Sequence, residues 1–215
     1  MAGRSKRMAT SRSPQFADCV FINCPFDAEY WPIFEAIVFC ILDCGFTPRS
    51  ALEFTDSGEV RIHRLRDLIR SSKYAIHDLS RVELSYSSGM PRFNMPFELG
   101  LDLGARWFGP RRLQSKRCLV LEGRQYAGHK ALSDIAGQEL SHHGNSPTNA
   151  IKSVRDWLQG ASERKTLPGP ASINARFAAF SGALPELATN AGVDRHRLSF
   201  IDYVNLAEGW LRFGV

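Results

Sequence analysis

The chain has 215 residues, of which 44% are hydrophobic and 23% charged, proportions typical of a folded protein large enough to bury a core. Its longest apolar stretch, residues 34–44, is too short to cross a bilayer and is interrupted by charged residues, so we expect no membrane partner. The formal net charge is +5, but four basic residues lie in residues 4–12, before the first acid at Asp18. The nearly neutral remainder argues against nucleic-acid binding, because that function requires a basic stripe on a folded face.

From residue 19 onward, the predicted elements alternate between short apolar strands and amphipathic helices. Apolar runs predict strands at residues 19–23, 46–52, 74–77 and 118–121. Apolar residues at helical spacing predict helices at residues 29–44, 60–72, 96–109 and 150–158. In the second of these helices, Ile62 is expected to face inward with its apolar neighbours. Residues 124–144 are ambiguous, and a helix over 131–136 followed by a short strand is our expectation there.

Strands without polar alternation are typical of a parallel sheet that is covered by helices on both faces. We therefore predict an α/β fold: a flavodoxin-like, doubly wound parallel sheet of about five strands in the order 2-1-3-4-5. This domain would span residues 18–161, followed by a linker at 162–172 and a small helical appendage at 173–215 that packs against the sheet. Residues 1–17 are expected to form a disordered basic tail, and a transit peptide is the alternative interpretation of the same composition.

The five cysteines, an odd number in mostly apolar surroundings, indicate reduced and buried thiols, as expected for a cytoplasmic protein. No cysteine or histidine spacing is typical of a zinc site, so we predict no metal. His77 is expected to pack within the sheet, whereas His142 and His143 are interpreted as an exposed loop pair.

In open parallel sheets, ligands bind beyond the carboxyl ends of the strands, where the strand order reverses. In the predicted order this point lies between the first and third strands, where residues 23–27, residues 78–81 and the start of the following helix converge. The polar residues brought together there are Asn23, Asp27, Asp78, Ser80, Arg81, Arg92, Asn94 and Glu98. Further candidate ligand-binding residues are Cys24, Pro25 and Phe26 in the first loop and Asp56 in the turn at 56–58.

Two of these acids each allow two interpretations. Glu98, placed in the first turn of a helix, is either stabilised there by the helix dipole or aimed into the crevice, where a carboxylate can stabilise or attack an oxocarbenium-like carbon. Asp78 follows a buried strand and either caps the next turn or belongs to the site. Arg81 and Arg92 are candidates to meet a phosphate or carboxylate group.

Several common motifs are missing from the sequence. It contains no GxGxxG, no GxxxxGK[ST] and no GxSxG. A Rossmann dinucleotide site, a P-loop and a serine-hydrolase nucleophile are therefore unsupported.

The run Val20–Asp27, Asp78 after the third strand, and Phe97–Gly100 opening a helix together resemble the nucleoside 2-deoxyribosyltransferase-like and TIR-like superfamily. The resemblance covers roughly residues 18–158, and the run 91–100 is also similar to bacterial TIR-like proteins. Members share a flavodoxin-like sheet and cleave N-glycosidic bonds of nucleosides or of NAD⁺. The resemblance implies that Glu98 is the catalytic glutamate, that Asp78 is the acid following the third strand, and that residues 23–26 approach the sugar.

The function implied is cleavage of a nucleotide N-glycosidic bond, most simply NAD⁺ hydrolysis, with NAD⁺ as the substrate and no cofactor. Asn23 and Asp78 would hold ribose hydroxyls, and Arg81 or Arg92 would meet phosphate. One alternative is a non-catalytic module that senses a nucleotide or self-associates as TIR domains do, using the long loop 82–90. Another is a nucleoside deoxyribosyltransferase, although residues 94–96 replace the usual Gly-Thr before the glutamate. A homo-oligomer and a role in bacterial defence follow from the family context alone.

Overall fold

The computed structural model describes residues 15–56, 58–82, 92–125, 132, 139–164 and 166–214. Its centre is a five-stranded sheet in the order β2-β1-β3-β4-β5, in which every neighbouring pair is parallel. The strands are β1 (Cys19–Asn23), β2 (Thr47–Ser50), β3 (Tyr74–Asp78), β4 (Arg117–Glu122) and β5 (Ser141–His142). This order confirms the predicted doubly wound, flavodoxin-like α/β fold. Its physical basis is that buried apolar strands need helices on both faces of the sheet.

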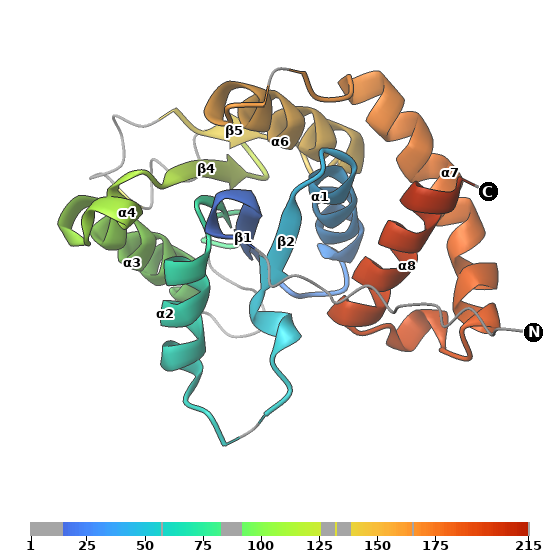
Figure 1. Cartoon of the computed structure of the whole chain (residues 1–215), viewed down its shortest axis with the longest axis horizontal. Helices are drawn as coiled ribbons and strands as arrows, with labels where there is room; N and C mark the ends of the chain where they lie inside the picture. The colour runs from blue at the N-terminus through green and yellow to red at the C-terminus, as the bar shows by residue number, and fades with distance from the viewer. Residues whose placement is uncertain are drawn as a thin grey trace, which may run out of the picture.

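Helices cover the two faces of the sheet (Figure 1). They are α1 (Trp31–Asp43), α2 (Arg61–Ser71), α3 (Asn94–Phe108), α4 (Arg111–Gln114), α6 (Pro147–Ala161), α7 (Pro170–Asn190) and α8 (Phe200–Phe213). Alternate residues of β1 point to opposite faces: Val20 and Ile22 join the core under α1 and α6, whereas Phe21 joins the core under α2. The α3 helix packs through Leu99 and Leu103 against Val120 of β4.

The C-terminal helices α7 and α8 form an outer layer against α1, on the far side of the molecule from α2, α3 and α4 (Figure 1). Phe180 of α7 stacks on Phe39 of α1, with ring centroids 5.3 Å apart, and also meets Trp210 of α8 at 5.7 Å. Since α1 is apolar around most of its circumference, it needs cover on both sides. The appendage therefore packs on α1, whereas the sequence predicted that it packs against the sheet.

Three details of the predicted elements change. The second strand is shorter than predicted, because residues 51–53 form a 3-10 helix, and the third strand extends by one residue to Asp78. Ile62, which was expected to face inward, is 40% exposed, since it lies in the first turn of α2 before the helix reaches the core. The predicted tail before residue 15, most of the loop 82–90 and the ambiguous helix 131–136 lie outside the described residues.

All five cysteines are free, and four of them are buried. Among the described residues, no helix is both long and apolar enough to cross a membrane. The same part of the chain contains no cluster of three or more histidine, cysteine or acidic side chains with a geometry suited to a metal ion.

Candidate functional site

The predicted convergence at the strand-order reversal is present. The register pairs Asn23 at the end of β1 with His77 near the end of β3, so these two strands finish at the same edge. The first turn of α3 lies against the same point, since the Asn23 side chain donates to the carbonyl of Met95 over 3.1 Å. Residues far apart in sequence thus meet where open parallel sheets bind ligands.

The orientation of the Asn23 amide is fixed by two bonds. Its Nδ2 lies 3.0 Å from Nδ1 of His77 and donates its other hydrogen to Met95. His77 Nδ1 is therefore the acceptor, which places the ring proton of a neutral imidazole on Nε2. No described residue donates to the Asn23 carbonyl oxygen, so this oxygen is the group that remains to accept a bond.

Behind His77 lies a buried charge pair. His77 Nε2 is 3.6 Å from Asp102 Oδ2, and the other carboxylate oxygen is 2.9 Å from Lys116 Nζ. Burial by itself would raise the pKa of Asp102, but the interactions with His77 and Lys116 outweigh it, so the net pKa is lowered. The Lys116 ammonium also donates to the carbonyl of Ile69 at the end of α2. The series Asn23, His77, Asp102, Lys116 links the ligand edge to the interior.

Glu98 lies on the inner face of α3 with only 6% of its surface exposed. Its nearest described cation is Arg61, whose Nη2 is 3.7 Å from Oε1. Burial raises the pKa of Glu98, and Arg61 and His77 oppose this only in part. Burial also raises the pKa of the Cys24 thiol, and the charge on Glu98 adds to this, so Cys24 is a neutral neighbour.

The expectation that Glu98 occupies the first turn of its helix is wrong. The α3 helix begins at Asn94, and no acid lies in its first turn. Proline is tolerated anywhere that the backbone N–H has no partner within the helix, so Pro96 does not fix where the helix starts. Stabilisation by the helix dipole, which fades beyond the first turn, therefore gives no account of a buried carboxylate at this position.

Asp78 is fully buried and holds three structural hydrogen bonds. It accepts from the Tyr30 hydroxyl at 2.5 Å, from His143 Nε2 at 2.9 Å and from the backbone N–H of Ser80 at 2.8 Å. Burial alone would raise its pKa, but these donors, led by His143, leave the net pKa lowered. These bonds make Asp78 an anchor for the loop after β3.

His143 corrects the interpretation of an exposed histidine pair: His142 is exposed, but His143 is fully buried. The backbone N–H of Asn145 donates to Nδ1 of His143, so Nε2 carries the proton and donates to Asp78. Ser80 Oγ lies 3.1 Å from the same Nε2. In a hydrolase triad the acid and the serine use opposite ring nitrogens, so this cluster is not one.

The two candidate arginines converge on one acid in the first loop. Arg81 Nε lies 3.2 Å from Asp27, and Arg92 Nη2 lies 3.4 Å from the same carboxylate. Arg81 also pairs with Glu29 at 3.0 Å. Burial by itself would raise the pKa of Asp27, but the bonds from Arg81 and from the Tyr30 backbone N–H leave it lowered. An incoming phosphate would have to exchange with Asp27 for these guanidinium groups.

The remaining candidates differ in how close they lie to this edge. Pro25 is buried, and the half-buried ring of Phe26 packs edge-on against Phe34 at 5.6 Å. Asn94 is exposed at the start of α3. Asp56 is exposed and accepts a hydrogen bond from the backbone N–H of Gly58 at 2.8 Å, which is a contact within its own turn.

No protein family, curated protein or solved structure matches this chain.

Proposed function

We propose that this domain cleaves the N-glycosidic bond of a nucleotide, with NAD⁺ as the favoured substrate and Glu98 as the catalytic carboxylate. The observation that carries the proposal is the nearly buried Glu98 at the strand-order reversal, where its nearest described cation is the exposed Arg61, 3.7 Å away. Burying a carboxylate with so weak a partner is costly for the fold alone. Such a cost is characteristic of a functional group.

The main requirement of this reaction is a carboxylate positioned near C1′ of the sugar. As the bond between C1′ and the base nitrogen breaks, the electron pair leaves with the base and positive charge develops on the sugar. The Glu98 carboxylate stabilises or traps that carbon, and water then supplies the oxygen that ends on C1′, releasing one proton. The Asn23 carbonyl oxygen would accept from a ribose hydroxyl, a role supported by the engagement of its amide hydrogens with His77 and Met95.

Asp78 has a different role in this proposal from the ribose contact that the sequence implied. Its carboxylate is engaged by Tyr30, His143 and the backbone of Ser80. We assign it to positioning the loop that carries Arg81. Arg81 and Arg92 would bind the pyrophosphate after releasing Asp27.

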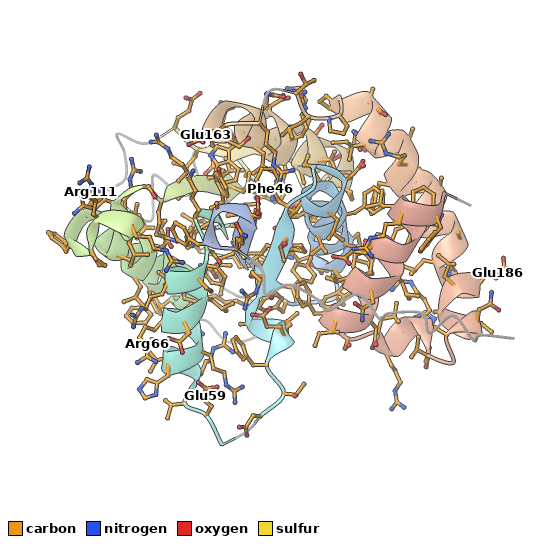
Figure 2. The ribbon with its side chains drawn as sticks, in the orientation of Figure 1. Phe46, Glu59, Arg66, Arg111, Glu163 and Glu186 are labelled. Atoms are coloured by element: carbon orange, nitrogen blue, oxygen red, sulfur yellow. The ribbon has the colours of Figure 1, made fainter. Side chains whose placement is uncertain are left out.

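The test is to incubate the purified protein with NAD⁺ and follow nicotinamide release by chromatography. Glu98→Gln keeps the shape of the side chain but removes its charge, and we expect it to lower turnover by about 10²–10⁴-fold. The matched control is Glu186→Gln on α7, at the opposite end of the molecule, which should leave turnover unchanged (Figure 2). Undiminished turnover in Glu98→Gln would remove this residue from the mechanism.

A parallel incubation with a deoxynucleoside and a free acceptor base distinguishes hydrolysis from transfer. A new nucleoside would indicate a deoxyribosyltransferase, whereas free base and free sugar would indicate hydrolysis. The comparison matters because both reactions begin with the same cleavage of the C1′–N bond.

A second candidate function is nucleotide sensing without chemistry, and the Asp27 cluster favours it. Its two arginines, paired with one partly exposed acid, form a site where phosphate can displace a carboxylate. In that case ADP-ribose would raise the melting temperature with no product formed. Asp27→Asn would strengthen this effect by removing the competing carboxylate.

A further inference from the structure

The α3 helix has its polarity reversed relative to an ordinary surface helix. Its acids Glu98 and Asp102 are buried, whereas its exposed large side chains are apolar. Phe108 is 88% exposed and Trp107 is 58% exposed. We define the apolar α3 face as Phe97, Leu101, Trp107 and Phe108 of α3 together with Ile62 of α2. A surface helix normally turns its charged residues outward, so folding of the chain does not explain this face.

A hollow of about 310 Å³ lies between α2 and α3 beside this face. Its lining surface is almost entirely apolar. The aliphatic residues Ile62, Ile69, Leu101 and Ala105 share this lining with the basic residues His63, Arg66 and Arg70. A hollow lined by both hydrocarbon and guanidinium groups suits a ligand that has an apolar part and an anionic part.

The charge around the face is strongly positive. The α2, α3 and α4 helices contain seven arginines and three acids, and Glu98 and Asp102 are buried, which leaves Asp67 as the exposed acid of these three helices. Arg66 and Arg111 project from this side of the molecule, where Glu59, just before α2, pairs with Arg64 (Figure 2). The three helices therefore carry more arginines than exposed acids.

The basic N-terminal segment joins the described structure at this same side. The Arg112 guanidinium of α4 lies 4.3 Å from the centroid of the Phe16 ring. The sequence places four more cations at residues 4–12, a few residues before Phe16. The N-terminal segment therefore enters the described structure beside α4.

We propose that the apolar α3 face and its arginines dock on an anionic phospholipid surface. Exposed aromatic and aliphatic side chains would enter the interface between headgroups and acyl chains, and the arginines would contact lipid phosphates. The aliphatic hollow favours lipid over nucleic acid, because bases stack on rings but gain little from Ile69 and Leu101. A second copy of the chain would bring another arginine-rich face toward this one, which its charge opposes. Docking of this kind needs no segment that spans the membrane.

The experiment is sedimentation of the intact protein with phosphatidylcholine vesicles that contain about 30 mol% phosphatidylglycerol, compared with phosphatidylcholine alone. We expect binding to the anionic vesicles that weakens with added salt. Tryptophan emission should shift to the blue on binding, and Trp107→Phe should abolish the shift, since Trp107 is the tryptophan on this face.

Two pairs of variants locate the docking surface. Phe108→Ser should weaken vesicle binding by roughly tenfold, whereas Phe213→Ser, an equally exposed phenylalanine on α8, should not. Arg111→Glu should weaken it by at least about fivefold, whereas Arg212→Glu on α8 should not. Circular dichroism and melting curves confirm that each variant is folded.

Four outcomes would overturn the proposal. The first is vesicle binding that survives the α3-face variants but is lost when the four basic residues at 4–12 are replaced by serine. The second is tight binding of a labelled 20-nucleotide oligonucleotide, sensitive to the same variants, with no vesicle binding. The third is a dimer in sedimentation velocity that Phe108→Ser dissociates, again without vesicle binding. The fourth is that the protein binds neither the vesicles nor the oligonucleotide and forms no dimer.

Discussion

Lys116→Met is expected to destabilise the domain severely, although the substitution preserves the length of the side chain. Lys116 Nζ lies 2.9 Å from the Asp102 carboxylate, and both side chains are almost completely buried. Removing the ammonium leaves a buried carboxylate whose remaining neighbour is His77, and breaking one half of such a pair costs about 3–5 kcal/mol. In a domain of this size the melting temperature should then fall by about 10 °C or more.

The pH dependence gives an independent check of the same pair. The folded pKa of Asp102 is lowered, so the pair contributes stability above the pKa of an unfolded aspartate, near 3.9, and that contribution is lost as the pH falls through the folded value. The difference in unfolding free energy between wild type and Lys116→Met should therefore be largest at neutral pH. It should shrink below about pH 4.

Urea unfolding, monitored by circular dichroism at pH 7 and pH 3.5, provides the measurement, with two controls. Lys152→Met removes an exposed i,i+4 pair with Asp156 and should change the unfolding free energy by less than about 0.5 kcal/mol. The double variant Lys116→Met/Asp102→Leu should recover most of the loss, because it leaves no uncompensated charge. If Lys116→Met proves as mild as Lys152→Met, the argument from the buried charge is refuted.

Three further predictions follow from named contacts. Tyr30→Phe removes one donor from buried Asp78 and should cost about 1–3 kcal/mol in urea unfolding, and a cost near zero would show that the bond contributes nothing. Arg61→Ala should raise the pKa of Glu98 further, so the acid limb of the pH–rate profile for base release should move to higher pH. An unchanged acid limb would show that Arg61 does not affect the ionisation of the catalytic group. Phe180→Ala should cost about 3–5 kcal/mol and shift a single unfolding transition, whereas two transitions would mean that α7 and α8 unfold apart from the sheet.

Much of the architecture could be predicted because it depends on short-range patterns. Residues 19–23 form an uninterrupted apolar run, which only a strand covered on both faces can bury, and every residue of β1 is buried. The first helix was predicted to end by residue 44, and Gly45, just after its last turn, takes the left-handed conformation with φ of +75°. The convergence of Asn23 with the loop after β3 followed from strand order alone.

The polar contacts within the site could not be predicted in the same way. His143 reaches Asp78 across 65 positions of sequence, and nothing near residue 143 indicates that its ring is buried. The pairing of Lys116 with Asp102 likewise depends on where α3 lies against β4. From sequence alone, such polar side chains are predicted to be exposed, because their partners come from distant parts of the chain.

The sequence by itself determined the sheet, its order and the edge at which a ligand would bind, because apolar periodicity and chain connectivity leave few alternatives. Only the tertiary structure decided which polar groups meet there: a buried Glu98 in the second turn of α3, an Asp78 already saturated with hydrogen bonds, and arginines paired with Asp27. It also decided that α3 turns its acids inward and its aromatic rings outward. The physical reason is that burial and electrostatic pairing depend on distances in space, which spacing along the chain does not determine.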